Sequence, residues 1–116
     1  MKKLILTGAT GMIGSAIVRE ALKQDYDITC IVRKNSSRIK NIPQDSRVHI
    51  IDADISEYKN LELKEKYDIF LHLAWYTVGG RDDVDCQLKN VEYTLDAVRL
   101  AKRCGVHCLY WGWKPS

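Results

Sequence analysis

KKLILTGATGMIGSAIVREAL, residues 2–22, predicts a buried strand, a glycine turn and an amphipathic helix in succession. The run Leu4–Leu6 is short and apolar, as in strands that are covered on both faces. A strand that leads through a turn into a helix begins the repeating unit of parallel α/β sheets. The helix is predicted from apolar residues at helical spacing, namely Ile13, Ala16, Ile17, Ala21 and Leu22.

Three glycines at three-residue spacing suit a dinucleotide site between this strand and this helix. Gly8 permits the tight turn, Gly11 lets the backbone approach a pyrophosphate, and Gly14 lets helix and strand pack closely. The helix N-terminus presents N–H groups and a positive dipole end to the phosphates, and Thr7 and Thr10 are expected to add hydroxyl donors. The alternative is a strand-to-helix turn that is rich in glycine without binding a cofactor.

The segment TGATGMIG, residues 7–14, resembles the Gly-x-x-Gly-x-x-Gly turn of extended short-chain dehydrogenases/reductases, the NAD(P)-dependent epimerase/dehydratase group. The resemblance continues through FLHLAW at 70–75 and NVEYTLDAVRLAKRCGV at 90–106, and covers about residues 2–106. It implies that the turn holds the cofactor's pyrophosphate. The cofactor-binding residues of the turn would then be Gly8, Thr10, Gly11, Met12, Ile13 and Gly14.

Further apolar runs predict strands at Asp27–Val32, Val48–Asp52 and Ile69–Ala74, with a polar loop at Asn35–Arg47 and a short charged helix or loop at Glu57–Lys66. One helix between the first two strands implies a parallel pair with a right-handed connection. We therefore predict one α/β domain over residues 1–116, a Rossmann-like doubly wound parallel sheet. It would have about five strands in the order 3-2-1-4-5.

The residue that ends the second strand of such a fold usually selects the nucleotide. A carboxylate there binds the ribose 2′-hydroxyl and repels a 2′-phosphate. This chain has Arg33 and Lys34, followed by Ser36, Ser37 and Arg38. Guanidinium and hydroxyl groups suit a phosphate dianion, so NADP(H) is predicted ahead of NAD(H). A solvated basic loop would give the same residues.

Asp54 and Ile55 follow the third predicted strand. In the family that the chain resembles, an Asp-hydrophobic pair at this point meets the adenine, and these two residues match it. A carboxylate here also suits a turn or a helix N-cap, and Ser56 before Glu57 fits a cap equally well. Both roles stay open for Asp54.

His72 lies inside the apolar fourth strand, where a histidine is more typical of a satisfied core residue than of a catalytic one. By the resemblance, Leu73 and Ala74 lie along the cofactor. The loop that follows is at the carboxyl end of the strand, where open α/β sheets place their ligands. Its candidates for substrate contact are Trp75, Tyr76 and Arg81.

The longest helix is predicted at Val84–Cys104, with one apolar stripe along it. Asn90 and Thr94 match the family's Asn-Val-x-x-Thr pattern, which implies that Asn90 bonds near the nicotinamide ribose or holds an ordered water. In the family this helix also forms a dimer interface, so a homodimer through helix 84–104 is implied. The stripe alone indicates burial against some partner, and it consists of Val84, Leu88, Val91, Leu95 and Val98.

The composition excludes several other classes of protein. The net charge of +3 is small and the basic residues are not clustered, which argues against a nucleic-acid partner. No window approaches membrane-spanning length. Four cysteines without a Cys-x-x-Cys pair predict reduced thiols in the cytoplasm and no metal site; they are Cys30, Cys86, Cys104 and Cys108.

The family's catalytic Tyr-x-x-x-Lys follows a Ser or Thr and lies on a helix beyond the fifth strand. Tyr110 and Lys114 have this spacing, but they fall where the fifth strand belongs. Gly112 and Pro115 also disfavour a helix there. No catalytic residue is therefore assigned, and the chain as written is expected to bind a dinucleotide weakly and to turn nothing over.

The tail at 106–116 suggests a hypothesis about its origin. Read one base later, the codons that must encode Trp111–Pro115 allow Gly-Ala-Gly-Ser, and those for Val106–Tyr110 allow an apolar strand. A one-base frameshift near codons 104–106 would thus explain a chain that ends at Ser116, and a naturally divergent tail is the alternative. In either case we expect the C-terminal half of the fold and the substrate domain to be missing, and part of the helix stripe to lie open.

Two functions are consistent with these residues. The first is the cofactor half of an NAD(P)-dependent epimerase, dehydratase or reductase. By resemblance, the complete enzyme would transfer a hydride between C4 of a nucleotide sugar, or a related carbonyl or alcohol, and the nicotinamide. The alternative is a catalytically dead, NADP(H)-sensing regulatory protein, because some relatives keep the fold and lose the tyrosine.

Overall fold

The structure is a computed structural model that describes residues 1–33, 38–74, 83–106 and 108–111. Some predictions concern residues outside these ranges: the basic loop residues Lys34, Ser36 and Ser37, the loop residues Trp75, Tyr76 and Arg81, and the tail residues Gly112, Lys114 and Pro115.

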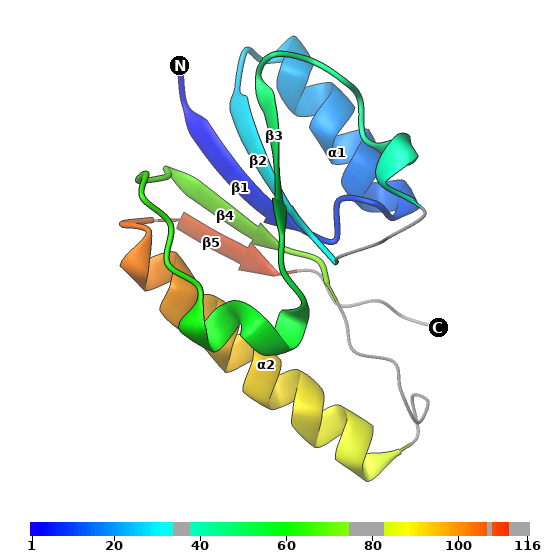
Figure 1. Ribbon diagram of the computed structural model, residues 1–116, viewed down its shortest axis with the longest axis vertical. Coiled ribbons are helices and arrows are strands. Elements are labelled where there is room, and N and C mark those ends of the chain that lie inside the picture. Colours follow the sequence, from blue (N-terminus) through cyan, green and yellow to red (C-terminus); the bar gives the residue numbers. More distant parts are fainter. Residues whose placement is uncertain (34–37, 75–82, 107, 112–116) are drawn as a thin grey trace.

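Five parallel strands form one sheet in the order β3-β2-β1-β4-β5 (Figure 1). The predicted fold class and strand order are therefore confirmed. Tyr110 lies on β5, as its rejection as a catalytic residue required. The strands are β1 Lys3–Thr7, β2 Asp27–Val32, β3 Val48–Asp52, β4 Ile69–His72 and β5 Cys108–Trp111.

Two α-helices cover opposite faces of the sheet, α1 at Met12–Lys23 and α2 at Val84–Arg103. Alternate residues of β1 show this arrangement, since Leu4 and Leu6 belong to the cluster under α1 and Ile5 belongs to the cluster under α2. Two short 3₁₀ helices complete the described structure, η1 at Ile39–Asn41 and η2 at Ile55–Asn60. Of the described helices, none is long and apolar enough to cross a membrane.

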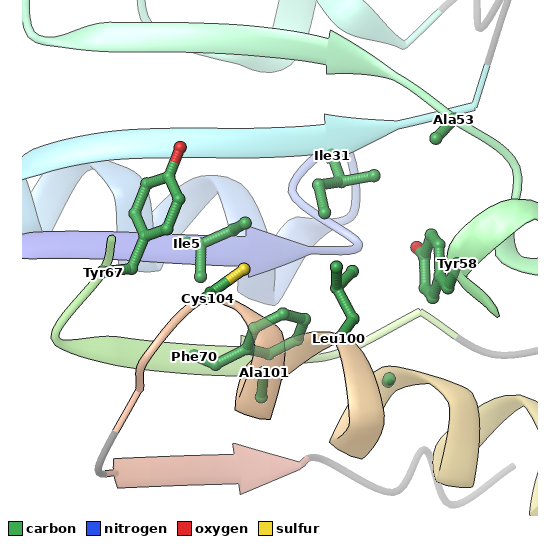
Figure 2. Packing of buried hydrophobic residues seen from close by; sticks show 10 residues of the cluster. Ile5, Ile31, Ala53, Tyr58, Tyr67, Phe70, Leu100, Ala101 and Cys104 are labelled. Atoms are coloured by element: carbon green, nitrogen blue, oxygen red, sulfur yellow. The ribbon is translucent and has the colours of Figure 1, made fainter. Parts of the chain in front are cut away.

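The cluster between the sheet and α2 draws side chains from β1, β2, β4, η2 and α2 (Figure 2). Ile5, Phe70 and Leu100 are fully buried in it. Burying each such side chain contributes about 1.5–3 kcal/mol. Tyr58, which belongs to η2, is buried in the same cluster, so this 3₁₀ helix packs against the hydrophobic core through its side chain (Figure 2).

The buried face of α1 differs from the predicted one. Ile13 is 69% exposed, whereas Ser15 and Val18 are buried beside Gly14 and Ala21. The reason is the contact at Gly14, where an added Cβ would lie 2.2 Å from the Gly8 carbonyl oxygen. The close backbone contact at Gly14, rather than the apolar residues around Ile13, therefore sets which face of the helix is buried.

The apolar stripe of α2 lies on the face turned away from the sheet. Leu88 is 56% exposed and Val91 is 58% exposed, while Ala97 and Leu100 on the other side are buried. The expectation that the stripe lies open is therefore confirmed. All its members are exposed, namely Val84, Leu88, Val91, Leu95 and Val98.

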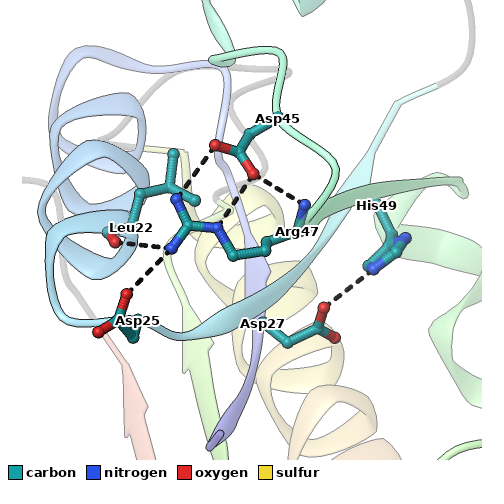
Figure 3. A network of polar contacts seen from close by, with 6 residues as sticks. All are labelled: Leu22, Asp25, Asp27, Asp45, Arg47 and His49. Atoms are coloured by element: carbon teal, nitrogen blue, oxygen red, sulfur yellow. Dashed lines mark hydrogen bonds and ion pairs between the residues drawn. The ribbon is translucent and has the colours of Figure 1, made fainter.

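A polar network closes the amino end of the sheet, opposite the glycine turn (Figure 3). The Arg47 guanidinium donates to the Leu22 carbonyl at 3.1 Å and to Asp25 at 3.3 Å, which satisfies the end of α1. It also donates two bonds to Asp45 and holds the pKa of that carboxyl at about 2. His49 bonds to Asp27 at 3.0 Å beside it. These residues hold the ends of α1, β2 and β3 together.

Candidate functional site

The glycine turn lies at the carboxyl ends of β1 and β4. Gly8 has φ +73°, in the left-handed region that favours glycine. A Cβ added there would meet the Leu73 carbonyl carbon at 2.8 Å and the Ala74 nitrogen at 2.9 Å. The predicted tight turn at Gly8 and close packing at Gly14 are both confirmed. The turn therefore lies directly against the end of β4.

The N-terminus of α1 opens from this turn toward solvent. Gly11 is its N-cap, and within the described residues no side chain caps it. Met12 is 88% exposed, and no acidic residue lies in the first turn. The Thr10 carbonyl accepts a bond from Asn41 at 3.3 Å, which ties η1 to the turn. A helix end with this exposure and no acidic side chain suits an anion.

Thr7 does not play its predicted role. Its side chain is fully buried, and its hydroxyl oxygen accepts bonds from the Leu73 and Ala74 backbone N–H groups at 2.9 and 3.1 Å. The expectation that Thr7 donates to a phosphate is therefore wrong. The same bonds explain why β4 ends at His72 rather than at Ala74, since the last two N–H groups turn to the Thr7 side chain.

His72 is a core residue, as its place in an apolar strand predicted. It is 3% exposed, and its Nδ1 lies 2.8 Å from the Thr7 hydroxyl. The Tyr58 ring meets the imidazole edge-on, with ring centroids 6.1 Å apart. Burial lowers the pKa of His72 to about 4, so the imidazole is neutral at pH 7. This cluster joins β1, β4 and η2 beneath the glycine turn.

Asp54 is the N-cap of η2, so the cap role is confirmed for it. Its Oδ2 accepts from the Ser56 backbone N–H at 3.2 Å and from the Ser56 hydroxyl at 2.7 Å. Its own N–H donates to Glu57 at 2.8 Å, which completes a capping box. In this box the Asp54 carboxylate also accepts from the Glu57 backbone N–H. A carboxylate has about four acceptor sites on its two oxygens, so it can still accept a bond from a ligand. Capping and ligand binding are therefore compatible at Asp54.

Arg33 and Asp54 each follow one of two neighbouring strands, β2 and β3. The Ala53 N–H donates to the Val32 carbonyl at 2.8 Å, so the residues after β2 and β3 leave the sheet side by side. Arg33 is exposed at this point, and Ile55 is partly buried. A cation and a carboxylate thus follow neighbouring strands at the carboxyl end of the sheet.

Asn90 lies on the inner face of α2 and is 2% exposed. Its amide donates to the Cys86 carbonyl at 3.1 Å, which fixes the side chain against its own helix. Leu73 and Ala74 lie between the glycine turn and the Thr7 hydroxyl and are partly buried. Their predicted contacts with a cofactor, like that of Asn90, stay predictions.

Sequence reasoning missed two residues of this region, Tyr58 and Arg103. Tyr58 fills the space beneath the turn, and burial raises the pKa of its hydroxyl above the usual range. Arg103 donates to the Tyr58 carbonyl at 2.7 Å and to the Leu61 carbonyl at 3.0 Å. A basic residue in the last turn of a helix was visible in the sequence, but its partner 45 positions away was not.

The structure describes all four cysteines of the chain. All four are free thiols, and burial raises the pKa of Cys30 to about 12. No group of three His, Cys, Asp or Glu side chains that could hold a metal ion occurs in the described ranges.

A parallel sheet with this strand order, a glycine turn and an open helix end defines a Rossmann-like α/β domain. The model of the NAD dependent epimerase/dehydratase family matches residues 4–112. The chain belongs to this family.

Curated relatives support this assignment at the level of sequence. An epimerase family protein of Staphylococcus aureus is 30% identical over 81 residues, which is 70% of this chain and 25% of the relative. A chloroplastic protein of Arabidopsis thaliana, named for a high chlorophyll fluorescence phenotype, is 25% identical over 103 residues, 89% of this chain and 25% of its own length. The chain spans about a quarter of the length of these relatives.

Solved structures share the fold. An epimerase from Methanothermobacter thermautotrophicus has a TM-score of 0.75 at 24% identity, over 95% of this chain and 34% of that one. A Bordetella bronchiseptica enzyme in complex with NAD⁺ has a TM-score of 0.74 at 22% identity, over 94% and 38%. A UDP-N-acetylglucosamine 4-epimerase from Methanobrevibacter ruminantium has a TM-score of 0.71 at 23% identity, over 93% and 36%.

Proposed function

We propose that this chain forms the nicotinamide-dinucleotide-binding domain of an epimerase, dehydratase or reductase. The observation that carries the proposal is the glycine turn against the end of β4, with the N-terminus of α1 open above it. Backbone N–H groups at this helix end would bind the pyrophosphate, and Gly11 would let it approach. Thr10, Met12 and Ile13 border the same position.

The adenosine half would lie over the ends of β2 and β3. The carboxylate of Asp54 has acceptor capacity beyond its capping bonds to Ser56 and Glu57, and it would accept a bond from the adenine amino group. Ile55 would flank the ring. Arg33 would pair with a 2′-phosphate, so we expect NADP⁺ to bind more tightly than NAD⁺, although the solved relative named above holds NAD⁺.

The nicotinamide half would extend past Leu73 and Ala74 toward Asn90. In the complete enzyme the bound cofactor would exchange a hydride with a nucleotide sugar or a related carbonyl or alcohol. The likeness to a solved UDP-N-acetylglucosamine 4-epimerase supports the sugar-nucleotide class. Hydride chemistry belongs to the cofactor, and the residues of this chain would bind and orient it.

Gly11→Ala is expected to weaken dinucleotide binding without unfolding the chain. The added Cβ would lie 3.6 Å from the Gly8 carbonyl oxygen, an ordinary contact, and Gly11 has φ −76°, which alanine adopts freely. It would occupy the space of the pyrophosphate, so the Kd for NAD⁺ and NADP⁺ should rise about tenfold or more. Isothermal titration calorimetry on both proteins measures this change.

The control for this experiment is Lys23→Ala at the far end of α1, which should leave both the Kd and the melting temperature unchanged. If Gly11→Ala binds the dinucleotides as tightly as the unmodified chain, the pyrophosphate is not at this turn. If the unmodified chain binds neither dinucleotide, the proposed function is wrong.

We also propose a homodimer through the exposed stripe of α2. Leu88→Lys combined with Leu95→Lys should convert the dimer to a monomer, because two charges would be buried in an apolar contact. Light scattering after size-exclusion chromatography gives the mass. Glu62→Lys, at an exposed position outside this helix, changes the net charge by the same +2 and should leave the dimer intact. An unmodified chain that is monomeric at all concentrations contradicts the proposal.

A further inference from the structure

The 3₁₀ helix η2 carries Asp54 at its start, and its position depends on contacts with the rest of the fold. It spans six residues, Ile55–Asn60, too few for a 3₁₀ helix to be stable in isolation. Its N-terminal end is closed from within by the bonds between Asp54, Ser56 and Glu57. The carboxylate and the helix therefore move as one unit, and whatever holds η2 also places Asp54.

Tyr58 attaches this unit to the rest of the fold through its side chain and through its carbonyl, while Ile55 and Leu61 pack against the same core cluster. The Tyr58 side chain is 2% exposed and packs edge-on against His72, which anchors the helix to the ends of β1 and β4. The Tyr58 carbonyl accepts a charge-assisted bond from Arg103 at 2.7 Å. Arg103 also bonds the carbonyl of Leu61, the C-cap of η2, at 3.0 Å. The guanidinium thus satisfies two carbonyls at the end of the helix, where a cation is favourable.

The backbone of Arg103 is fixed by its neighbours, so its side chain can hold η2 in place. Arg103 is the last residue of α2, and the side chains around it on the inner face, Leu100, Ala101 and Cys104, are buried in the main core. Its carbon chain extends from that fixed helix end to the carbonyls of η2. The position of α2 against the sheet is in this way transmitted to η2 and to Asp54.

We propose that Arg103 is a positioning residue for the adenine end of the cofactor site, acting through η2 on Asp54. The inference rests on the proposed function and deepens it, since it names what sets the recognition of the adenine amino group. Arg103 itself touches neither the ring nor the phosphates in this proposal. Removing its two bonds would let η2 shift, and Asp54 would lose its alignment with the adenine.

The test compares NAD⁺ with nicotinamide hypoxanthine dinucleotide, in which a carbonyl replaces the adenine amino group. The unmodified chain should prefer NAD⁺ about fivefold, because the carbonyl of the analogue presents an acceptor to Asp54 where the amino group presents a donor. Arg103→Gln should raise the Kd for NAD⁺ by a similar factor and leave the Kd for the analogue within about twofold, so that the preference disappears. Arg103→Lys, which can still donate to one carbonyl, should retain an intermediate preference.

Two further variants separate positioning from a general structural effect. Arg99→Gln, one turn earlier on α2 and paired with Asp96 at 3.2 Å, should leave the preference unchanged. In an Asp54→Ala background, Arg103→Gln should change the Kd for NAD⁺ by less than about twofold, because its target is already gone.

Several outcomes would overturn the inference. One is an equal loss of affinity for both dinucleotides in Arg103→Gln, and another is an additive effect in the double variant. If Arg103→Gln does not fold, Arg103→Lys decides, and an unchanged preference in it is contrary to the proposal. If the unmodified chain prefers NAD⁺ and no Arg103 variant changes this preference, the inference is wrong and the proposed function is unaffected. An unmodified chain that binds neither dinucleotide overturns both.

Discussion

Gly14→Ala is expected to unfold the chain or to lower its melting temperature by about 10 °C or more. An added Cβ would lie 2.2 Å from the Gly8 carbonyl oxygen and 2.8 Å from the Ala9 Cα. Both atoms belong to the backbone, so no rotamer change relieves the overlap. The helix α1 would have to move off β1, at a cost of about 3 kcal/mol or more, from a total stability that is about 5–15 kcal/mol for a domain.

Thermal unfolding followed by circular dichroism measures this effect, and Gly11→Ala is the matched comparison. The same chemical change at Gly11 meets one protein atom at 3.6 Å and requires no unusual φ. The melting temperature of that variant should stay within about 3 °C of the unmodified value. If Gly14→Ala has the same melting temperature as Gly11→Ala, the helix does not approach the turn as closely as described. The pair thus separates the glycine that the fold needs from the glycine that the proposed cofactor needs.

The strands and their order could be predicted because a parallel sheet buries whole apolar runs and fixes the direction of each connection. Asp27–Val32 and Val48–Asp52 have the predicted bounds. The rotation of α1 could not be predicted from apolar periodicity, because Ile13 looks like a core residue and the backbone contact at Gly14 outweighs it. On α2 the apolar stripe is exposed although its period is regular, because the period gives no information about which surface will cover the stripe.

At the candidate site, the sequence was informative where backbone geometry is the requirement and failed where a side chain has two possible uses. The positive φ at Gly8 follows from the turn, and the structure has it. Thr7 has a hydroxyl that suits a phosphate, yet it bonds to the end of β4 instead. Arg103 and Tyr58 are joined across 45 positions, and no local pattern encodes such a pair. The contacts of Arg33, Asp54 and Asn90 with a cofactor stay predictions.

The stability of the fold should fall as the pH is lowered from 7.5 to 5.0, because of His72. Burial lowers its pKa to about 4 in the folded chain, whereas an exposed histidine titrates at about 6.5. Between these two values the unfolded chain binds a proton that the folded chain excludes. The free energy of unfolding therefore decreases as the pH falls through this window, by about 2 kcal/mol at pH 5.0. Above pH 7.5 both states are neutral at this residue and the effect is absent.

Urea unfolding at pH 7.5 and at 5.0 measures this loss, and two variants assign it. His72→Gln removes the titrating ring, so its loss between the two pH values should be smaller by about 2 kcal/mol, whatever its stability at pH 7.5. His49→Gln removes an exposed imidazole instead and should keep the loss between the two pH values, whatever its stability at pH 7.5. Asp45 is not expected to contribute, because its pKa of about 2 and its ordinary value both lie below pH 5. If His72→Gln loses as much stability as the unmodified chain, the imidazole is hydrated in the folded state. The Thr7, His72 and Tyr58 cluster beneath the glycine turn would then not be the closed unit on which the placement of η2 depends.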